Sequence, residues 1–205
     1  MSNPLPLQGG DYYHIFNRGV NRQNLFLEER NYRYFLKLYA HHVEPVAETY
    51  AYCLLPNHFH LLVRIKTAEE QQHDHEIRKV PEIARVSNPG QAFSNLFNAY
   101  TKAMNQAYGR TGSLFERPFH RLAVTSDSYF AQLVVYIHQN PQRHGLSEDF
   151  RQWPYSSYQA LCSSGPTRIK RDDVLAWFGG PAQLVTAHHQ HNDAQRLKPV
   201  LLEDW

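Results

Sequence analysis

The chain has 205 residues, enough for one ordinary domain with a tail and too few for two full domains. Its apolar fraction of 42% supports a sizeable core, yet no apolar stretch approaches the length that a membrane span requires. The net charge of +2 is too weak to indicate a nucleic-acid partner by itself. The start of the chain lacks the layout of a signal peptide, and Cys53 and Cys162 have no nearby partner for a redox or metal motif. We therefore expect a cytoplasmic protein that makes no membrane contact.

Strand and helix patterns follow one another along the whole chain. In order, they predict strand 11–17, a helix beginning at residue 28, strands 48–55 and 58–66, a helix over 93–109, strand 114–125 and helices 127–139, 172–178 and 181–190. Residues 67–90 are polar and are predicted to form a partly mobile surface insertion. This order predicts an α+β domain built on an antiparallel sheet with helices packed on one face. The predicted division is a main domain over residues 1–160 and a C-terminal helical extension over residues 161–205.

The strand over residues 58–66 carries the first candidate site. Because side chains two apart share a face of a strand, Phe59 and its alternate neighbours form an apolar face, and His58 and His60 lie on a mostly polar one. Two neutral imidazoles about 7 Å apart along a strand can bind one divalent ion. The spacing alone is weak, because the chain has 13 histidines and a His-apolar-His triplet arises by chance roughly 0.3 times. Two hydrogen-bonded histidines on a sheet face remain the alternative.

The helix over residues 127–139 carries the second candidate. Ser126 is a plausible N-cap, and Asn140-Pro141 is predicted to stop the helix. At about 100° per residue, Tyr136 falls beside the apolar stripe, and Asn140 follows it by one turn on the same flank. A tyrosine at this place is also typical of the edge of an ordinary core.

Phosphodiester cleavage is the chemistry that needs these residues together. A tyrosine oxygen is a poor nucleophile near neutral pH, so it needs an electrophilic phosphate beside it. A divalent metal held by His58, His60 and the Asn140 carbonyl would polarise that phosphate. The expected covalent product is a 5′-phosphotyrosine with a free 3′-OH, whose ends can be rejoined without a nucleotide cofactor.

The motifs as a set resemble the single-tyrosine HUH transposases, and in particular the REP-associated tyrosine transposase branch. The resemblance covers most of the chain, over residues 12–158. It is carried by four segments in this order: Tyr13-His14-Ile15-Phe16-Asn17-Arg18-Gly19, Leu55-Pro56-Asn57-His58-Phe59-His60, Tyr136-Ile137-His138-Gln139-Asn140-Pro141 with Arg143-His144-Gly145, and Trp153-Pro154-Tyr155-Ser156-Ser157-Tyr158. Each segment is modest alone, and the four in this order are specific.

The resemblance implies a sheet of RRM/ferredoxin-like topology, Tyr136 as the nucleophile and Asn140 as a third metal ligand beside His58 and His60. It also implies Mg²⁺ or Mn²⁺ as the cofactor, hairpin-bearing single-stranded DNA as the substrate, and a monomer or a homodimer. Under this interpretation a group of basic residues is expected to line a groove for DNA phosphates. These are Arg18, Arg64, Lys102, Arg110, Arg117, His120 and Arg121.

Several alternatives were weighed against this interpretation. A rolling-circle replication initiator carries a lysine three or four residues after its tyrosine, where this chain has Gln139 and Asn140. A mobilisation relaxase places the tyrosine before the histidines, and an amidohydrolase barrel needs about 250 residues. An RRM-like RNA-binding module needs stacking aromatics on the face that His58 and His60 occupy. A transposase relic that binds hairpin DNA without cutting it remains an alternative.

Overall fold

A computed structural model describes residues 6–78 and 88–190. Its centre is a four-stranded antiparallel sheet in the order β2-β3-β1-β4. The strands are β1 (Tyr12–Arg18), β2 (Ala47–Leu55), β3 (His58–Ile65) and β4 (His120–Ala123). A helix follows β1 and another precedes β4, so the α+β class and the RRM/ferredoxin-like topology predicted from the sequence are confirmed.

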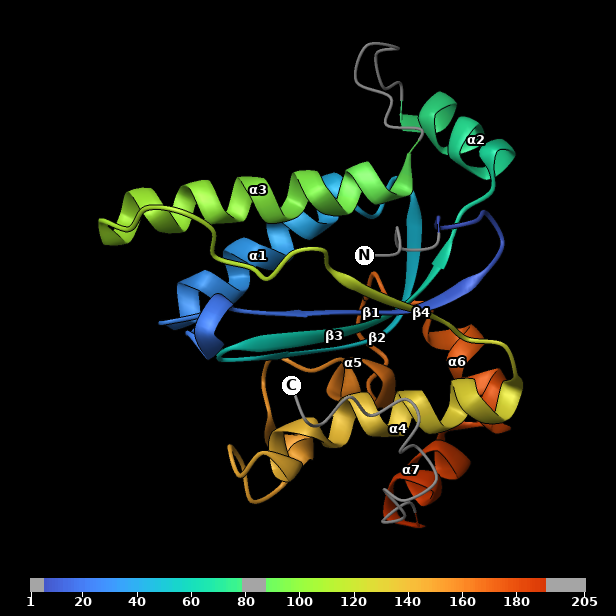
Figure 1. Cartoon of the computed structure of the whole chain (residues 1–205). Coiled ribbons are helices and arrows are strands. Elements are labelled where there is room, and N and C mark those ends of the chain that lie inside the picture. Colours follow the sequence, from blue (N-terminus) through green and yellow to red (C-terminus); the bar gives the residue numbers. More distant parts are fainter. Residues whose placement is uncertain (1–5, 79–87, 191–205) are drawn as a thin grey trace.

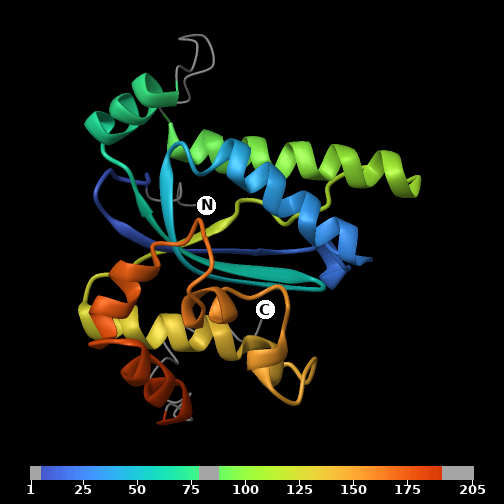
Figure 2. The ribbon, with the colours of Figure 1, turned by 180° about the vertical axis from the view of Figure 1, so that it is seen from behind.

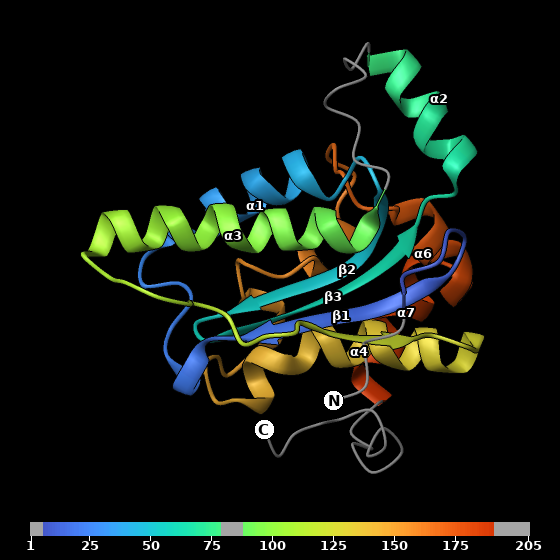
Figure 3. The same cartoon turned by 45° about the horizontal axis from the view of Figure 1, so that its top comes forward.

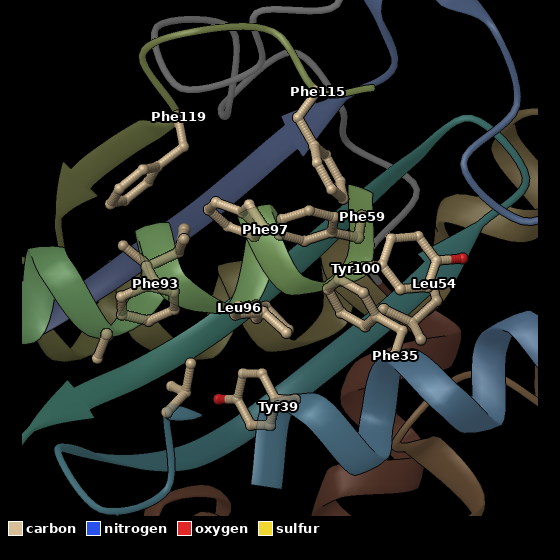
Figure 4. Packing of buried hydrophobic residues seen from close by; sticks show 14 of the residues in the cluster. Phe35, Tyr39, Leu54, Phe59, Phe93, Leu96, Phe97, Tyr100, Phe115 and Phe119 are labelled. Atoms are coloured by element: carbon tan, nitrogen blue, oxygen red, sulfur yellow. The ribbon is translucent and has the colours of Figure 1, made fainter. Parts of the chain in front are cut away.

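Helices α1 (Glu29–His42) and α3 (Pro89–Tyr108) pack side by side on one face of this sheet (Figures 1 and 2). Local sequence sets their ends. A capping box between Glu28 and Asn31 begins α1, while Asn88 caps α3 and Gly109, with φ 61°, ends it. Figure 4 shows the aromatic core that the two helices form with the sheet, in which Phe59 of β3 lies among side chains of α1 and α3. The apolar face predicted for β3 is therefore buried here.

A second helical layer covers the opposite face of the sheet (Figures 1 and 2). It consists of α4 (Asp127–Arg143), α5 (Tyr158–Cys162), α6 (Arg171–Phe178) and α7 (Pro181–Gln190). Its core includes Leu62 of β3 together with Leu133 and Ile137 of α4. The helices thus lie on both faces, which corrects the predicted one-face arrangement. The predicted boundary at residue 160 falls within α5, a helix that the sequence patterns did not indicate.

Two local predictions are corrected. The face of β3 expected to be mostly polar is buried, since Leu62 is fully covered and His60 is 5% exposed beneath α4. Pro141 does not stop α4, which continues to Arg143. A proline removes only one backbone hydrogen bond near the end of a helix, and the buried packing of this last turn compensates for that loss.

The segments that flank the sheet also differ in part from the predictions. Strand β4 is shorter than expected, because Phe115 in its predicted first half forms only an isolated bridge with Gly19, and the strand itself begins at His120. Helix α2 (Ala68–Arg78) occupies the first half of the predicted insertion and lies beyond the end of the sheet in Figure 3. Residues 79–87 of that insertion lie outside the described residues, so its mobility stays a prediction, and residues 88–90 form the N-cap and start of α3. Short 3-10 turns cover Val20–Arg22 and Phe150–Gln152. Within the described residues, no helix combines the length and apolarity needed to cross a membrane.

Candidate active site

The imidazoles of His58 and His60 lie at the start of β3, on the sheet face that α4 covers. Their ring centroids are 5.2 Å apart. Both line a cavity of about 490 Å³, whose walls also include Tyr136 of α4 and His144, the residue after its last turn. The structure therefore brings the predicted histidine pair and the predicted tyrosine to one cavity, although they are more than 70 residues apart in the chain.

Hydrogen bonds fix how the two rings of the pair are turned. His58 Nδ1 lies 2.8 Å from Oδ1 of Asn57, and His60 Nδ1 lies 2.9 Å from Nε2 of His14. Because a carboxamide oxygen only accepts, Asn57 holds the His58 proton on Nδ1. The Nε2 atom of His58 is then the nitrogen whose lone pair can bind a cation.

Both rings of the pair are held in the neutral form that a metal ligand needs. Burial first, and then the nearby His144 and Arg18, lower the pKa of His58 from 6.5 to about 3. The pKa of His60 is lowered well below 6.5, mainly by burial. The neighbouring imidazoles, that of His14 first, act in the same direction. A cation can therefore bind near neutral pH without displacing a proton from either imidazolium.

Tyr136 is buried against the histidine pair, not merely beside an apolar core. Its ring centroid lies 5.5 Å from that of His60 in an edge-to-face arrangement, and its side chain lines the same cavity. The guanidinium of Arg143, two turns later on α4, lies 5.4 Å from the Tyr136 ring centroid. A positive group thus stands at the ring where a phosphate would have to approach.

Asn140 occupies the turn of α4 between Tyr136 and His144, which both line the cavity. It is fully buried, and its Nδ2 donates to the Tyr136 carbonyl oxygen at 2.8 Å. Its Oδ1 is buried without a hydrogen-bond partner, which is the kind of oxygen that a hard divalent cation would satisfy. Asn140 does not itself line the cavity, so the structure places the predicted third ligand next to the site without bringing it fully into it.

The donor set fits a Mg²⁺ or Mn²⁺ ion that is only partly enclosed by protein. Within the described ranges, no group of three or more His, Cys, Asp or Glu residues is placed to hold a metal. Two imidazoles and one amide oxygen lack the closed, charge-rich shell of a structural metal site. Such an incomplete set leaves coordination positions for phosphate oxygens, as a catalytic ion requires.

The predicted DNA-contacting residues do not line one groove. Arg18 lines the histidine cavity and pairs with Glu116 at 2.8 Å. Arg117 and Arg121 line a separate cavity of about 460 Å³ that also borders α3, where the Arg121 guanidinium lies 4.2 Å from the Phe119 ring centroid. A continuous groove is therefore corrected to two cavities at the β1 and β4 edge of the sheet.

The other four predicted contacts lie apart from one another. His120 stacks on Phe16 with ring centroids 5.1 Å apart, and Lys102 is exposed on α3. Arg110 donates to Gln23, near the end of α3. Arg64 lies six residues beyond His58 on β3 and pairs with glutamates of β2 and α2. Its guanidinium therefore links β3 to β2 and α2 through ion pairs, a structural role that the alternating pattern of the strand could not reveal.

Sequence reasoning missed several residues of the site. His144 has its ring centroid 4.8 Å from that of His58, and its spacing of two helical turns from Tyr136 was a usable signal. Asn57 was treated only as part of a turn, although it precedes His58 directly. His14 gave no signal of its own, because its contact with His60 depends on which strands pair.

Comparisons with known proteins bear on the fold and the relatives of the chain. No family model matches the chain. A Haemophilus influenzae protein named for the REP-associated tyrosine transposases is 30% identical over 111 residues, which cover 54% of this chain and 58% of that protein. The match therefore spans little more than half the length of the curated relative. A solved structure of a REP-associated tyrosine transposase bound to a REP hairpin shares the fold, with a TM-score of 0.58 at 17% identity over 80% of this chain and 86% of that one.

Proposed function

We propose that this chain, which the comparisons support assigning to the REP-associated tyrosine transposases, is a metal-dependent enzyme that cleaves and rejoins hairpin-bearing single-stranded DNA. The observation that carries the proposal is the cavity shared by Tyr136 and the His58–His60 pair. Tyr136 also packs in the core beneath α4, and its side chain lines the same cavity as the two neutral imidazoles. The substrate class is taken from the hairpin in the solved neighbour, and the chemistry from the residues of this cavity.

In the proposed reaction the phenolic oxygen of Tyr136 attacks the scissile phosphorus. The new oxygen–phosphorus bond forms as the bond from phosphorus to the 3′ oxygen breaks; the phenol proton is released to solvent, and the leaving 3′ oxygen takes up a proton from solvent. The products are a 5′-phosphotyrosine and a free 3′-OH, and attack by a 3′-OH on the phosphotyrosine reverses the step. Two guanidinium groups would place positive charge near the phosphate: Arg143 lies at the tyrosine ring, and Arg18 lies in the cavity wall.

His58 and His60 would hold the divalent ion, with Asn140 Oδ1 as the adjoining oxygen donor. When bound, Mg²⁺ or Mn²⁺ supplies Lewis-acid polarisation of the phosphate. The protein contributes the orientation of the two rings and the walls of the cavity that they line. Because Tyr136 meets the pair within one chain, the proposed enzyme needs no partner subunit to deliver its nucleophile.

The direct test is incubation with hairpin-bearing single-stranded DNA and Mn²⁺, followed by denaturing electrophoresis for a covalent protein–DNA adduct. We expect an adduct with the wild type, none with Tyr136→Phe and almost none with His58→Ala. Tyr129→Phe is the matched control, because Tyr129 lies two turns earlier on α4 and does not line the cavity. An adduct that persists in Tyr136→Phe refutes the nucleophile assignment. Hairpin binding by the wild type without any adduct would instead identify a protein that binds and does not cut.

A further inference from the structure

His14 is a buried histidine that the proposed chemistry does not use. It lies in β1, is 1% exposed, and stacks on Phe16 with ring centroids 4.5 Å apart. Its Nε2 lies 2.9 Å from Nδ1 of His60, and the two rings are nearly parallel with centroids 5.1 Å apart. The antiparallel register of β1 and β3, which pairs His14 with Leu62 and Phe16 with His60, sets this contact. A polar side chain buried on a sheet face needs a reason to be there, because burying it costs free energy unless it is hydrogen-bonded.

The contact decides which nitrogen of His60 can face the cavity. In a neutral imidazole one nitrogen carries the proton and the other a lone pair. If the His60 proton is on Nδ1, it is donated to His14 Nε2, and the lone pair on Nε2 remains for a cation. If His14 donates instead, the His60 proton sits on Nε2, and that ring cannot be a ligand through Nε2. His14 and Asn57 therefore have corresponding positions: His14 contacts Nδ1 of His60, and Asn57 contacts Nδ1 of His58.

We propose that His14 is a positioning residue of the metal site, accepting a hydrogen bond from His60 Nδ1 and so holding His60 with its Nε2 lone pair toward the cavity. His14 does not line that cavity, and it acts on the metal site through its hydrogen bond to His60. Partners that orient metal-bound histidines in this way typically change metal affinity by about 10–100-fold when they are lost. This inference rests on the proposed function, because it assigns His60 as a ligand.

The experiment compares Mn²⁺ binding, measured from the electron paramagnetic resonance signal of the free ion, in four proteins without DNA. His14→Phe keeps a stacking ring but cannot accept a hydrogen bond, and we expect it to weaken Mn²⁺ binding by about 10-fold or more. His14→Gln places an amide oxygen at similar reach, and we expect affinity within about threefold of the wild type. His138→Phe is the matched control, since it also removes a buried His–His hydrogen bond, of 2.8 Å, but does not line the cavity.

A second measurement covers the case in which His14→Phe does not fold. Ring ¹⁵N shifts of the histidine-labelled wild type with Mg²⁺ are expected to show the His60 proton on Nδ1. A proton on Nε2 of His60 in that state overturns the inference. If His14→Phe binds Mn²⁺ as tightly as the wild type, the inference about His14 is also overturned. The assignment of His58 and His60 as metal ligands would survive that result. A wild type that binds no Mn²⁺ overturns the metal assignment and this inference together.

Discussion

Acid should destabilise this fold strongly, because three buried histidines and the half-buried His58 are held in the neutral form. Burial lowers the pKa of His14 and of His58 from 6.5 to about 3. It also lowers the pKa of His60 and of His138 well below 6.5. In the unfolded chain each of these rings takes up a proton as the pH falls below 6.5, while the folded protein does not. The stability they contribute is therefore complete above pH 6.5 and is lost as the pH falls from there toward the folded pKa values.

The magnitude follows from proton linkage. Between pH 7.5 and 5.5, one histidine with an unfolded pKa of 6.5 that stays neutral in the fold lowers the free energy of unfolding by about 1.4 kcal/mol. Four such groups sum to about 5 kcal/mol, which is comparable with the whole stability of many domains. Partial protonation through local opening would reduce this figure, so it is an upper estimate.

Urea unfolding followed by circular dichroism at pH 7.5 and 5.5, in buffer with a chelator, measures this loss. His138→Gln, which removes one of the four rings away from the cavity, should reduce the difference between the two pH values by about 1.4 kcal/mol. His41→Gln is the control, since His41 is exposed on α1 and should leave that difference unchanged. A wild-type loss below about 1.5 kcal/mol, or an unchanged difference in His138→Gln, refutes the reasoning.

Three further changes test the roles assigned above. Arg121→Ala should weaken binding of hairpin DNA and lower the salt slope of log K by about 1, measured by fluorescence anisotropy across salt concentrations; unchanged binding removes it from the DNA surface. Arg64→Ala should leave DNA binding intact but lower the free energy of unfolding by about 1–2 kcal/mol, because its partly buried guanidinium pairs with Glu48 and Glu70; weakened DNA binding would contradict its structural role. Gly19→Ala should lower the midpoint of thermal unfolding by several degrees, because an added Cβ would meet the Gln23 carbonyl oxygen, whereas Gly165→Ala, with open surroundings, should not.

The sequence by itself determined most of the elements and the faces on which the key side chains lie. Alternation in the strand of His58 and His60 put the two rings on one side, and helical spacing put Tyr136 on a flank with Asn140 one turn later. These are local properties, because the two-residue repeat of a strand and the 3.6-residue repeat of a helix fix the direction of each side chain from its neighbours. The structure reproduces them where the periodic patterns are long, and shortens β4 where the pattern is broken at Pro118.

Only the tertiary structure decided what those faces meet. Strand pairing brought His14 to His60, and the second helical layer buried the face that alternation marked as polar, placing Tyr136 against the pair. The same packing engaged Arg64 in ion pairs at the far end of β3, although its sequence position looked like that of a DNA contact. Such contacts join residues far apart in the chain, and local periodicity carries no information about which surfaces come together. Burial and pairing between layers, not the residue patterns, made a cavity from these side chains.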